Sequence, residues 1–449
     1  MRLLYAVHHL PPTHTGGAEN RALRTARWMS GQGHAVELMG VESIDRAEPA
    51  YQDAHEAALV IRRLNFDAHA FSDRWHWQYD NEILEERVAA ALAEFRPDVF
   101  HLISGYLMTA GALRAAHRAG VPIVVTLTDF WFLCPHITLL RSDGSLCPRP
   151  PEDALGCVRC LAQERRLFRL PARWLRGLAD AIWRVAGDRL PWLPVSGAQV
   201  QARRVSLHEA LDWASVLICP SRFLLDQYQQ AGVAPHKLRL MRQGLVLPAN
   251  PAPTAEAPPR SVFTIGYSGQ IKAHKGVDLL IEAARQLTAA GFPLTLALYG
   301  DTAEDPAYMR SLQHRFGEVP WLEWRGRYTA AQVWPVLAGL DVLVVPSRWY
   351  ENSPNVILEA QAARVPVVTT DLGGMSELVR HEVDGLLFRL NDADDLARQL
   401  TRLLTEPDLL RRLRAQAPPV KALADEMHAL ELIYQELTAP GGRQADAHE

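Results

Sequence analysis

Short apolar runs alternate with longer amphipathic stretches along both halves of this 449-residue chain. The expected strands are residues 3–7, 35–41, 99–103, 123–127, 264–267, 294–299, 342–345 and 365–369. The helical patterns of the first half cover residues 19–32, 81–95 and 107–119. Apolar strands separated by helices indicate parallel sheets that are covered on both faces. We therefore expect an α/β protein with two doubly wound, Rossmann-like domains.

A proline-rich stretch divides the two halves of the chain. We assign residues 249–260 to a linker, because residues 249–259 hold four prolines. The first domain is expected over residues 1–248, with an insertion rich in Cys, Arg and Trp at about 130–204. The second domain is expected over residues 261–420. A helix over 421–438 and a polar, disordered tail over 439–449 follow it.

Two glutamates flank the predicted start of a helix in the second domain. Ser353 is a suitable N-cap and Pro354 a suitable first helical residue. Glu351 then precedes the helix, while Glu359 lies on a mostly small, apolar helix face, where a carboxylate is costly unless it is bound. Hydroxyl groups of a sugar or ribose can donate to such carboxylates, and the helix N-terminus favours an anion such as a diphosphate. The alternative is a solvated Glu359 together with a Glu351 that only complements the dipole at the helix start.

A glycine-rich loop at residues 266–276 follows the first strand of the second domain. Two of the four lysines in the chain, Lys272 and Lys275, lie in this loop. Lys275 would neutralise phosphate charge as a point cation. The loop has neither a Walker A nor a G-x-G-x-x-G pattern, which argues against ATPase and dinucleotide-binding functions. The alternative is a strand–helix connection with surface lysines.

Together these motifs resemble the retaining glycosyltransferases of family 4. The E-x7-E pair Glu351 and Glu359 is that family's signature, and the loop ending in Lys275-Gly276 is its phosphate element. Residues 16–19, 219–221 and 373–377 also match, and the resemblance extends over about 2–438. It implies the GT-B architecture, in which two domains face a cleft. It also implies transfer of a sugar from a nucleotide-diphosphate donor with retained anomeric configuration and no catalytic metal.

The resemblance also implies roles for individual residues. Lys275 would stabilise the leaving diphosphate, Glu351 would hold a hydroxyl of the donor sugar, and Asp129 would face the acceptor. Glu359 would hold the ribose. The implied donor-binding residues are Gly16, Gly17, Gly269, Gln270, Lys272, Lys275, Glu351, Asn352, Ser353, Asn355, Val356 and Glu359.

The chain departs from the family pattern at two positions. Gln270 stands where the family often has arginine, and we hypothesise that Lys272 supplies the missing charge. Thr128 stands where a histidine often precedes the aspartate. Nearby histidines that could substitute for it follow the first strand: His8, His9 and His14.

Other functions and sites are weighed against this interpretation. A nucleotide-sugar epimerase or a phosphorylase of the same fold is the closest alternative, and a degenerate, non-catalytic partner subunit is another. The sequence does not fix the donor base, the sugar or the acceptor, which could be lipid-linked, a polysaccharide or a small molecule. The D-x-D sequence at residues 392–394 is interpreted as a helix cap rather than a metal motif.

Four of the five cysteines lie within the insertion: Cys134, Cys147, Cys157 and Cys160. Four cysteines ending in C-x2-C in a reducing compartment predict a structural zinc site. The other two spacings fit no named zinc finger. The alternative is a set of buried, unligated thiols.

Residues 165–204 carry nine arginines and only two acids, with three tryptophans and an apolar side. This composition suits either a cationic helix at a membrane interface or a helical cover on the first domain, and we slightly favour the cover. No export signal or transmembrane stretch is apparent, so we expect a cytoplasmic protein, with peripheral contact at the inner face of the membrane as the alternative. The net charge of −4 gives no indication of nucleic-acid binding.

Overall fold

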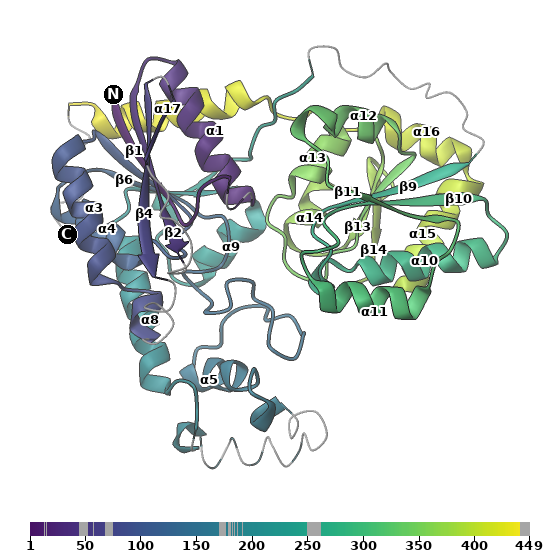
Figure 1. Cartoon of the computed structure of the whole chain (residues 1–449), viewed down its shortest axis with the longest axis horizontal. Helices are drawn as coiled ribbons and strands as arrows, with labels where there is room; N and C mark the ends of the chain where they lie inside the picture. The colour runs from purple at the N-terminus through teal and green to yellow at the C-terminus, as the bar shows by residue number, and fades with distance from the viewer. Residues whose placement is uncertain are drawn as a thin grey trace. The chain divides into compact units, whose positions relative to one another are not determined.

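The computed structural model divides the chain into two compact units, each built on one sheet (Figure 1). It describes residues 1–44 except 13 and 15, 53–67 except 57, 75–169, 177, 181, 183, 185, 187–190, 192–248 and 262–440. The first unit comprises Met1–Pro220, Leu224–Met241 and the chain from Met427 on. The second comprises Ser221–Phe223 and Arg242–Glu426.

The first unit holds a sheet in the order β3-β4-β2-β1-β5-β6-β7-β8. Its strands are β1 Arg2–Val7, β2 Ala35–Ile44, β3 Ala54–Glu56, β4 Leu59–Asp67, β5 Val99–Ile103, β6 Ile123–Thr126, β7 Val216–Cys219 and β8 Leu238–Leu240. Only the edge strand β3 is antiparallel to its neighbour among these strands. The helices include α1 Gly17–Gly31, α3 Glu82–Phe95, α4 Thr109–Arg118, α5 Ala154–Ala162, α8 Gly197–Asp212, α9 Arg222–Gln230 and α17 Leu423–Thr438.

The C-terminal helix α17 completes the core of the first unit. The Tyr434 hydroxyl lies 2.6 Å from Nδ1 of the buried His101, whose Nε2 lies 2.8 Å from Thr126 Oγ1. By contrast, residues 242–248 group with the second unit. There Gly244 N donates to Glu426 Oε2 at 2.7 Å and Leu245 pairs with Ala422. These hydrogen bonds explain why the division falls at Met241, whereas the sequence-based boundary was residue 248.

The second unit holds a fully parallel sheet in the order β11-β10-β9-β12-β13-β14. Its strands are β9 Phe263–Ser268, β10 Leu294–Tyr299, β11 Leu322–Gly326, β12 Val342–Val345, β13 Val367–Thr370 and β14 Gly385–Phe388. Its helices are α10 Val277–Ala289, α11 Pro306–Phe316, α12 Val333–Ala338, α13 Asn355–Ala362, α14 Gly373–Leu378, α15 Ala393–Thr405 and α16 Pro407–Ala415. Helices lie on both sides of each sheet, which confirms the predicted α/β class (Figure 1).

The strand order of each sheet reverses direction once. In the second unit this switch lies between β9 and β12, where Ile265 stands opposite Val342. In the first unit it lies between β1 and β5, where Leu3 stands opposite Val99. Ligands of doubly wound sheets bind beyond the carboxyl ends of strands at such a switch. The loops that follow β9 and β12, and those that follow β1 and β5, are therefore the places to look for a site.

Three expectations concern residues outside the described part of the structure. These are the linker at 249–260, most of the tail at 439–449 and the central portion of the stretch at 165–204. Among the helices of the described residues, none has the length and apolarity needed to span a bilayer.

Candidate functional site

The loop after β9 packs against the loop after β12 at the switch point of the second unit. Gly269 N donates to Tyr299 O at 3.0 Å, and a short 3-10 turn at Ala273–Lys275 leads to Gly276. Gly276 has φ 72°, and a Cβ there would overlap the carbonyl oxygen of Pro346. Only glycine therefore allows this approach of the two backbones. The packing brings the predicted phosphate loop next to the residues that precede Glu351.

Lys275 and Glu351 form an ion pair between these loops. Lys275 Nζ lies 2.5 Å from Glu351 Oε1 and 4.8 Å from the centre of the Trp349 ring. The same Oε1 accepts hydrogen bonds from Ser347 Oγ at 2.9 Å and Trp349 Nε1 at 2.7 Å. Burial raises the pKa of Glu351, but the charge of Lys275 and these three hydrogen bonds hold it below its usual value. Glu351 is thus ionised at neutral pH although its side chain is only 14% exposed.

Arg348 and Asp278 hold the two loops together beside this pair. The Arg348 guanidinium donates to both Asp278 oxygens, at 2.7 and 2.8 Å, and Arg348 N donates to His274 O at 2.8 Å. The His274 ring meets the Trp349 ring edge-on at 4.9 Å. Burial, together with the charge of Lys275, lowers the pKa of His274 to about 4, so this ring is neutral at pH 7. The sequence analysis singled out none of Arg348, Asp278 and His274, because their contacts depend on strand order.

Gln270 and Lys272 share one acidic partner on the loop after β10. Gln270 Nε2 donates to Glu304 Oε1, and Lys272 Nζ lies 3.0 Å from the same oxygen. The backbone of Gln270 is fixed as well, since Tyr267 Oη donates to its carbonyl at 2.6 Å. The charge that we expected Lys272 to offer to phosphate is therefore paired with Glu304. The sequence analysis did not identify Glu304.

The start of α13 differs from the prediction. The helix begins at Asn355 with Pro354 as its N-cap and no side-chain cap, so assigning Ser353 as the N-cap was wrong. The segment is held by other contacts: Gly374 N donates to Glu351 O at 2.9 Å, and Gln243 Nε2 donates to Ser353 O at 2.5 Å. These contacts fix the backbone of Glu351 and Ser353 before the helix begins.

Polar atoms without partners gather at this helix start. Ser353 Oγ and Asn355 Oδ1 are buried and make no hydrogen bond with any residue that the structure describes. Buried polar atoms are nearly always hydrogen-bonded, so two such atoms beside free helix N–H groups indicate a place for a polar ligand. Asn352 and Val356 flank them and are half-buried.

Glu359 lies one turn into α13 and is half-buried. Burial raises the pKa of Tyr328 and the charge of Glu359 raises it further, although Ser268 Oγ lies 2.7 Å from the tyrosine oxygen. Tyr328 and Tyr299 meet edge-on at 5.5 Å. Glu359 therefore lies near the aromatic rings of Tyr299 and Tyr328, at the carboxyl ends of β10 and β11.

The remaining predicted site residues, Gly16, Gly17 and Asp129, belong to the first unit. Gly16 and Gly17 are exposed at the start of α1, after the loop that follows β1. Asp129 follows β6, and its Oδ2 accepts hydrogen bonds of 3.0 Å from Ser104 Oγ and from Thr128 Oγ1. Trp131 N donates to Asp129 Oδ1 at 2.8 Å. The threonine that replaces the expected histidine thus serves to orient the aspartate.

The histidines after β1 form a packed cluster. His9 and His14 stack at 3.8 Å, and His8 Nε2 lies 3.3 Å from an oxygen of the buried Glu19. Burial, opposed by a hydrogen bond with Val41 O and assisted by the neighbouring histidines, lowers the pKa of His9 to about 4. The cluster also contacts the loop that follows β5, because the His8 ring lies 5.7 Å from that of Tyr106.

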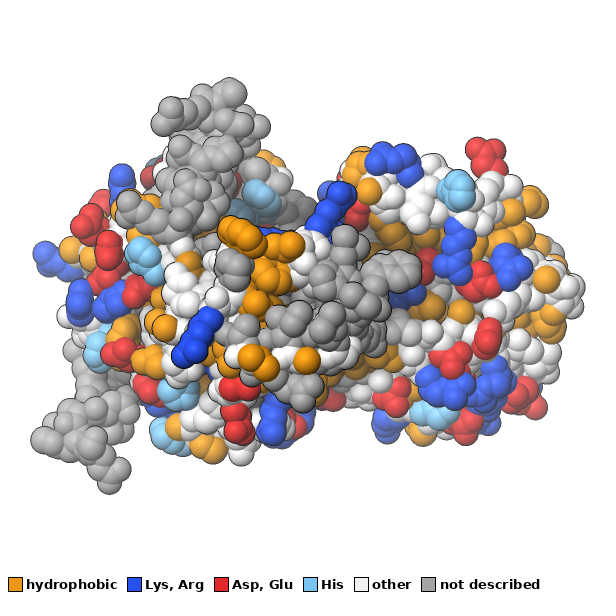
Figure 2. All heavy atoms as spheres, turned by 90° about the horizontal axis from the view of Figure 1, so that it is seen from below, with side chains coloured by type: hydrophobic (Ala, Val, Ile, Leu, Met, Phe, Trp, Pro, Cys, Tyr) orange, Lys and Arg blue, Asp and Glu red, His pale blue; other side chains and the backbone are white. Residues whose placement is uncertain are grey.

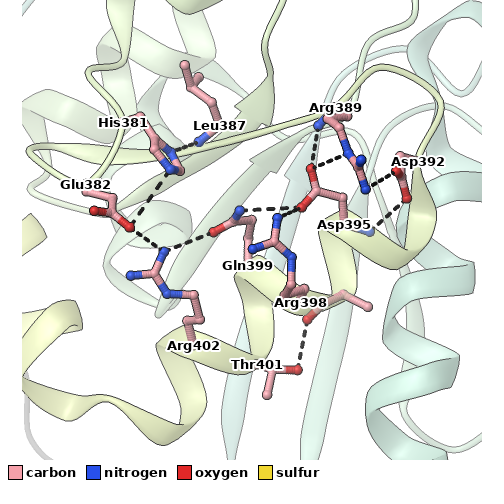
Figure 3. Close-up of polar contacts among 11 residues, drawn as sticks. His381, Glu382, Leu387, Arg389, Asp392, Asp395, Arg398, Gln399, Thr401 and Arg402 are labelled. Carbon is pink, nitrogen blue, oxygen red and sulfur yellow. Dashed lines mark hydrogen bonds and ion pairs between the residues drawn. The ribbon is translucent and has the colours of Figure 1, made fainter.

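The D-x-D sequence at residues 392–394 is a helix cap (Figure 3). Asp392 Oδ1 accepts from Asp395 N at 2.8 Å, and Arg389 lies 2.8 Å from the Asp392 carboxylate. Asp395 accepts a hydrogen bond from Arg389 N at 2.8 Å and also pairs with Arg398. These contacts confirm the interpretation as a cap.

Two family models match the chain. The model described as "Glycosyl transferase 4-like domain" matches residues 16–244, just over half of the chain. The model described as "Glycosyl transferases group 1" matches residues 262–406. The two matches fall on the first and second units respectively.

Relatives and solved structures agree with these matches. The Streptomyces kanamyceticus alpha-D-kanosaminyltransferase is 32% identical over 38% of this chain and 45% of its own length. A D-inositol 3-phosphate glycosyltransferase from Nocardiopsis dassonvillei is 24% identical over 78% of this chain and 73% of its own. The matched segments span only 38 to 46% of the first three curated relatives.

Two solved structures share the fold. Sucrose-phosphate synthase from Thermosynechococcus elongatus superposes with a TM-score of 0.66 at 17% identity, over 97% of this chain and 99% of that one. Anabaena HepE in complex with UDP superposes with a TM-score of 0.64 at 16% identity, over 97% of this chain and 100% of that one.

Proposed function

The chain belongs to the group 1 glycosyltransferases, with a glycosyl transferase 4-like first domain, and we propose that it transfers a sugar from a nucleotide-diphosphate sugar with retained anomeric configuration. The observation that carries the proposal is the arrangement at the switch point of the second unit. There an ionised Glu351, the cation Lys275 and the unpartnered Ser353 Oγ and Asn355 Oδ1 come from two loops held together by Gly276 and Arg348.

Each part of this arrangement suits one part of the donor. The free N–H groups of α13 and the Lys275 ammonium would bind the diphosphate, and their effect grows as charge develops on the leaving group. The Glu351 carboxylate would accept a hydrogen bond from a sugar hydroxyl. Glu359 would accept from the ribose, with the nearby Tyr299 and Tyr328 rings available to the base.

A screen of nucleotide sugars tests the proposal. UDP-, GDP-, ADP- and dTDP-sugars are added to the protein, and its melting temperature and the hydrolysis of each donor are measured. A ligand that binds only the folded state raises the melting temperature, so we expect a shift and slow hydrolysis with at least one donor. A shift with free phosphate and a sugar phosphate alone would favour the phosphorylase. Epimerised donor would favour the epimerase, and binding without any turnover would favour a non-catalytic subunit.

We further propose that the acceptor is lipid-linked and that the protein contacts the inner face of the membrane peripherally. Exposed apolar side chains on the insertion support this: Leu167 is 56% exposed, Val185 88% and Trp192 73%. Figure 2 shows hydrophobic side chains gathered on the face that it presents. Arg165, Arg166 and Arg169 are exposed in the same segment and would meet anionic headgroups.

Cosedimentation with vesicles of anionic and of neutral lipid tests the membrane contact. We expect binding to anionic vesicles at low salt, weakened in a Leu167→Ser/Trp192→Ser variant. The matched control is Leu432→Ser, because Leu432 is 58% exposed but lies on α17. The membrane contact would be contradicted if the wild type, the double variant and the control sedimented equally with neutral and anionic vesicles, or if none of them sedimented with either. Neither result would affect the proposed sugar transfer.

A further inference from the structure

The insertion after β6 gathers four of the five cysteines around one small cavity. Cys134, Cys147 and Cys157 are buried, Cys160 is half-buried, and all four are free thiols. They line a cavity of about 30 Å³. A cavity of that size has room for roughly two water molecules, so it suits a small ion rather than an organic ligand.

The four thiols reach the cavity from three local structures. Cys134 closes a turn in which its N–H donates to Phe130 O at 2.7 Å. The chain at 139–147 folds back on itself, with an antiparallel bridge between Leu140 and Leu146 and a bond from Cys147 N to Leu139 O at 2.7 Å. Cys157 and Cys160 stand three residues apart on α5 and so share one helix face. The local fold thus brings together cysteines that are far apart in the sequence.

Two adjacent arginines of α8 supply positive charge beside these thiols. Arg204 Nη2 lies 3.2 Å from Cys157 Sγ and 2.7 Å from Pro151 O. Arg203 is 3% exposed, donates to Trp131 O and lies 5.5 Å from that ring. The ion pairs among the described residues include none for Arg203, and its Nη1 has no hydrogen-bond partner there.

A buried guanidinium without a counter-charge is costly. Burial lowers the pKa of Arg203 to about 10, and negative charge on the nearby Cys134 and Cys157 sulfurs would raise it again. Neutral thiols would leave this cation uncompensated, whereas thiolates would compensate it. Thiolates bound to a metal ion would supply the counter-charge that the buried Arg203 lacks.

We propose that Cys134, Cys147, Cys157 and Cys160 bind one structural Zn²⁺. When Zn²⁺ binds, the four thiols lose four protons. The resulting zinc tetrathiolate has a net charge of −2, which Arg203 and Arg204 offset. In the structure Cys147 Sγ donates to Arg149 O at 2.9 Å. Among the described residues, no three His, Cys, Asp or Glu side chains lie close enough together to bind a metal ion without moving. The thiols must therefore rotate towards the cavity when the ion binds.

The ion would link α5 to the turn and the hairpin beside it. Among the residues that the structure describes, the buried members of the hydrophobic cluster around α5 are Cys157, Val158, Leu161, Val195 and Val200. A closed tetrahedral site would link the turn at Cys134, the hairpin at Cys147 and α5. It would thereby fix the chain that follows Asp129.

Metal analysis of the full chain, purified without a chelating tag or added metal chelator, tests the proposal. We expect one zinc per chain by elemental analysis. Before the zinc is removed, no thiol other than Cys219 should react with a thiol reagent. Cys147→Ser and Cys160→Ser should each lose most of the zinc, while Cys219→Ser should retain it, because Cys219 is buried in β7. Circular dichroism checks that the variants are folded.

The wild-type protein alone decides the matter if the cysteine variants fail to fold. Less than a tenth of an equivalent of zinc together with five free thiols, or with disulfides, would overturn the proposal. Stoichiometric iron would overturn the assignment to zinc. Arg204→Met should speed the loss of zinc to a chelator about tenfold, since partners of metal ligands affect affinity by that order. The exposed Arg239→Met serves as its control, and equal rates in the two variants would contradict the charge compensation.

Discussion

The loops at the carboxyl ends of the two sheets carry different chemistry. In the second unit, cations and carboxylates alternate: Lys275 with Glu351, Arg348 with Asp278, and Lys272 with Glu304. In the first unit, Asp129 is held by hydroxyl and amide donors, and the His9 ring is kept neutral. The same fold thus offers fixed charge in one unit and hydrogen bonds in the other. Fixed positive charge suits a diphosphate, whereas a hydrogen-bonded carboxylate beside uncharged rings suits hydroxyl groups.

The largest effect is expected from removing the charge of Lys275. Lys275→Met should lower turnover of the donor about a hundredfold or more, because losing one stabiliser of developing charge costs about 2.7–4 kcal/mol. Steady-state kinetics on a variant shown to be folded measures this. Lys237→Met is the control, since Lys237 donates to Asp212 O in the first unit. Turnover near the wild-type value in folded Lys275→Met would show that the fixed charges of the second unit do not act on the donor.

Substitution of Asp129 tests whether the loops of the first unit act on the acceptor. Asp129→Asn keeps the shape but loses the charge, and we expect transfer to the acceptor to fall about tenfold or more, through loss of orientation. Hydrolysis of the donor by water should stay unchanged, because the donor contacts proposed above lie in the second unit. The two rates are measured side by side. If both fall equally, Asp129 belongs to the donor site instead.

Glu359 separates binding from chemistry within the second unit. Glu359→Gln should raise the KM for the donor about tenfold and leave turnover unchanged, because contacts with the ribose are similar in the ground and transition states. A hydrogen bond to a charged group is worth roughly 1.5–3 kcal/mol, which agrees with this size. A fall in turnover at unchanged KM would place Glu359 at the reacting centre.

The two units should lose stability together at mildly acidic pH. His9 and His274 both have a pKa of about 4, below the usual 6.5. The unfolded chain therefore binds more protons between these values, so stability is full above about pH 6.5 and falls as pH decreases towards 4. We expect a loss of about 1 kcal/mol for each histidine at pH 5. Thermal unfolding of His9→Gln and His274→Gln from pH 7 to 5 should show a shallower slope, and slopes equal to wild type would contradict it.

The smallest effect concerns Glu304. Glu304→Gln would release Lys272 from its ion pair and let its charge act on the donor phosphates. Because partly exposed ion pairs are worth about 0–1 kcal/mol, we expect the donor KM to fall about two- to fivefold. A KM that rises would show that Glu304 positions the loop, and one that stays constant would show that Lys272 does not replace the missing arginine.

The sequence predicted the fold well where strands are continuous apolar runs. Residues 99–103, 294–299 and 342–345 coincide with β5, β10 and β12. The edge strand β11 was missed because Glu323 and Arg325 interrupt its apolar pattern. Burial on both faces makes central strands easier to recognise than edge strands. The interior strands β4 and β7 were nevertheless missed as well.

The site could be predicted only in part for a related reason. Lys275 and Glu351 were identified from their local motifs, but their ion pair depends on β9 lying next to β12. The N-cap at Ser353 was wrong because Gln243 and Gly374, distant in the sequence, fix that segment. Local preference decides a helix start only when tertiary contacts leave it free.

Hydrogen–deuterium exchange with and without a nucleotide sugar locates the donor site. We expect protection of the backbone at residues 269–276 and 347–359 when the donor chosen by the thermal screen is added. We expect no change at residues 389–402, where charged side chains cap α15 and pair with one another (Figure 3). Exchange that stays unchanged at 269–276 and 347–359, or protection confined to 389–402, would contradict the assignment of the donor site to the loops after β9 and β12.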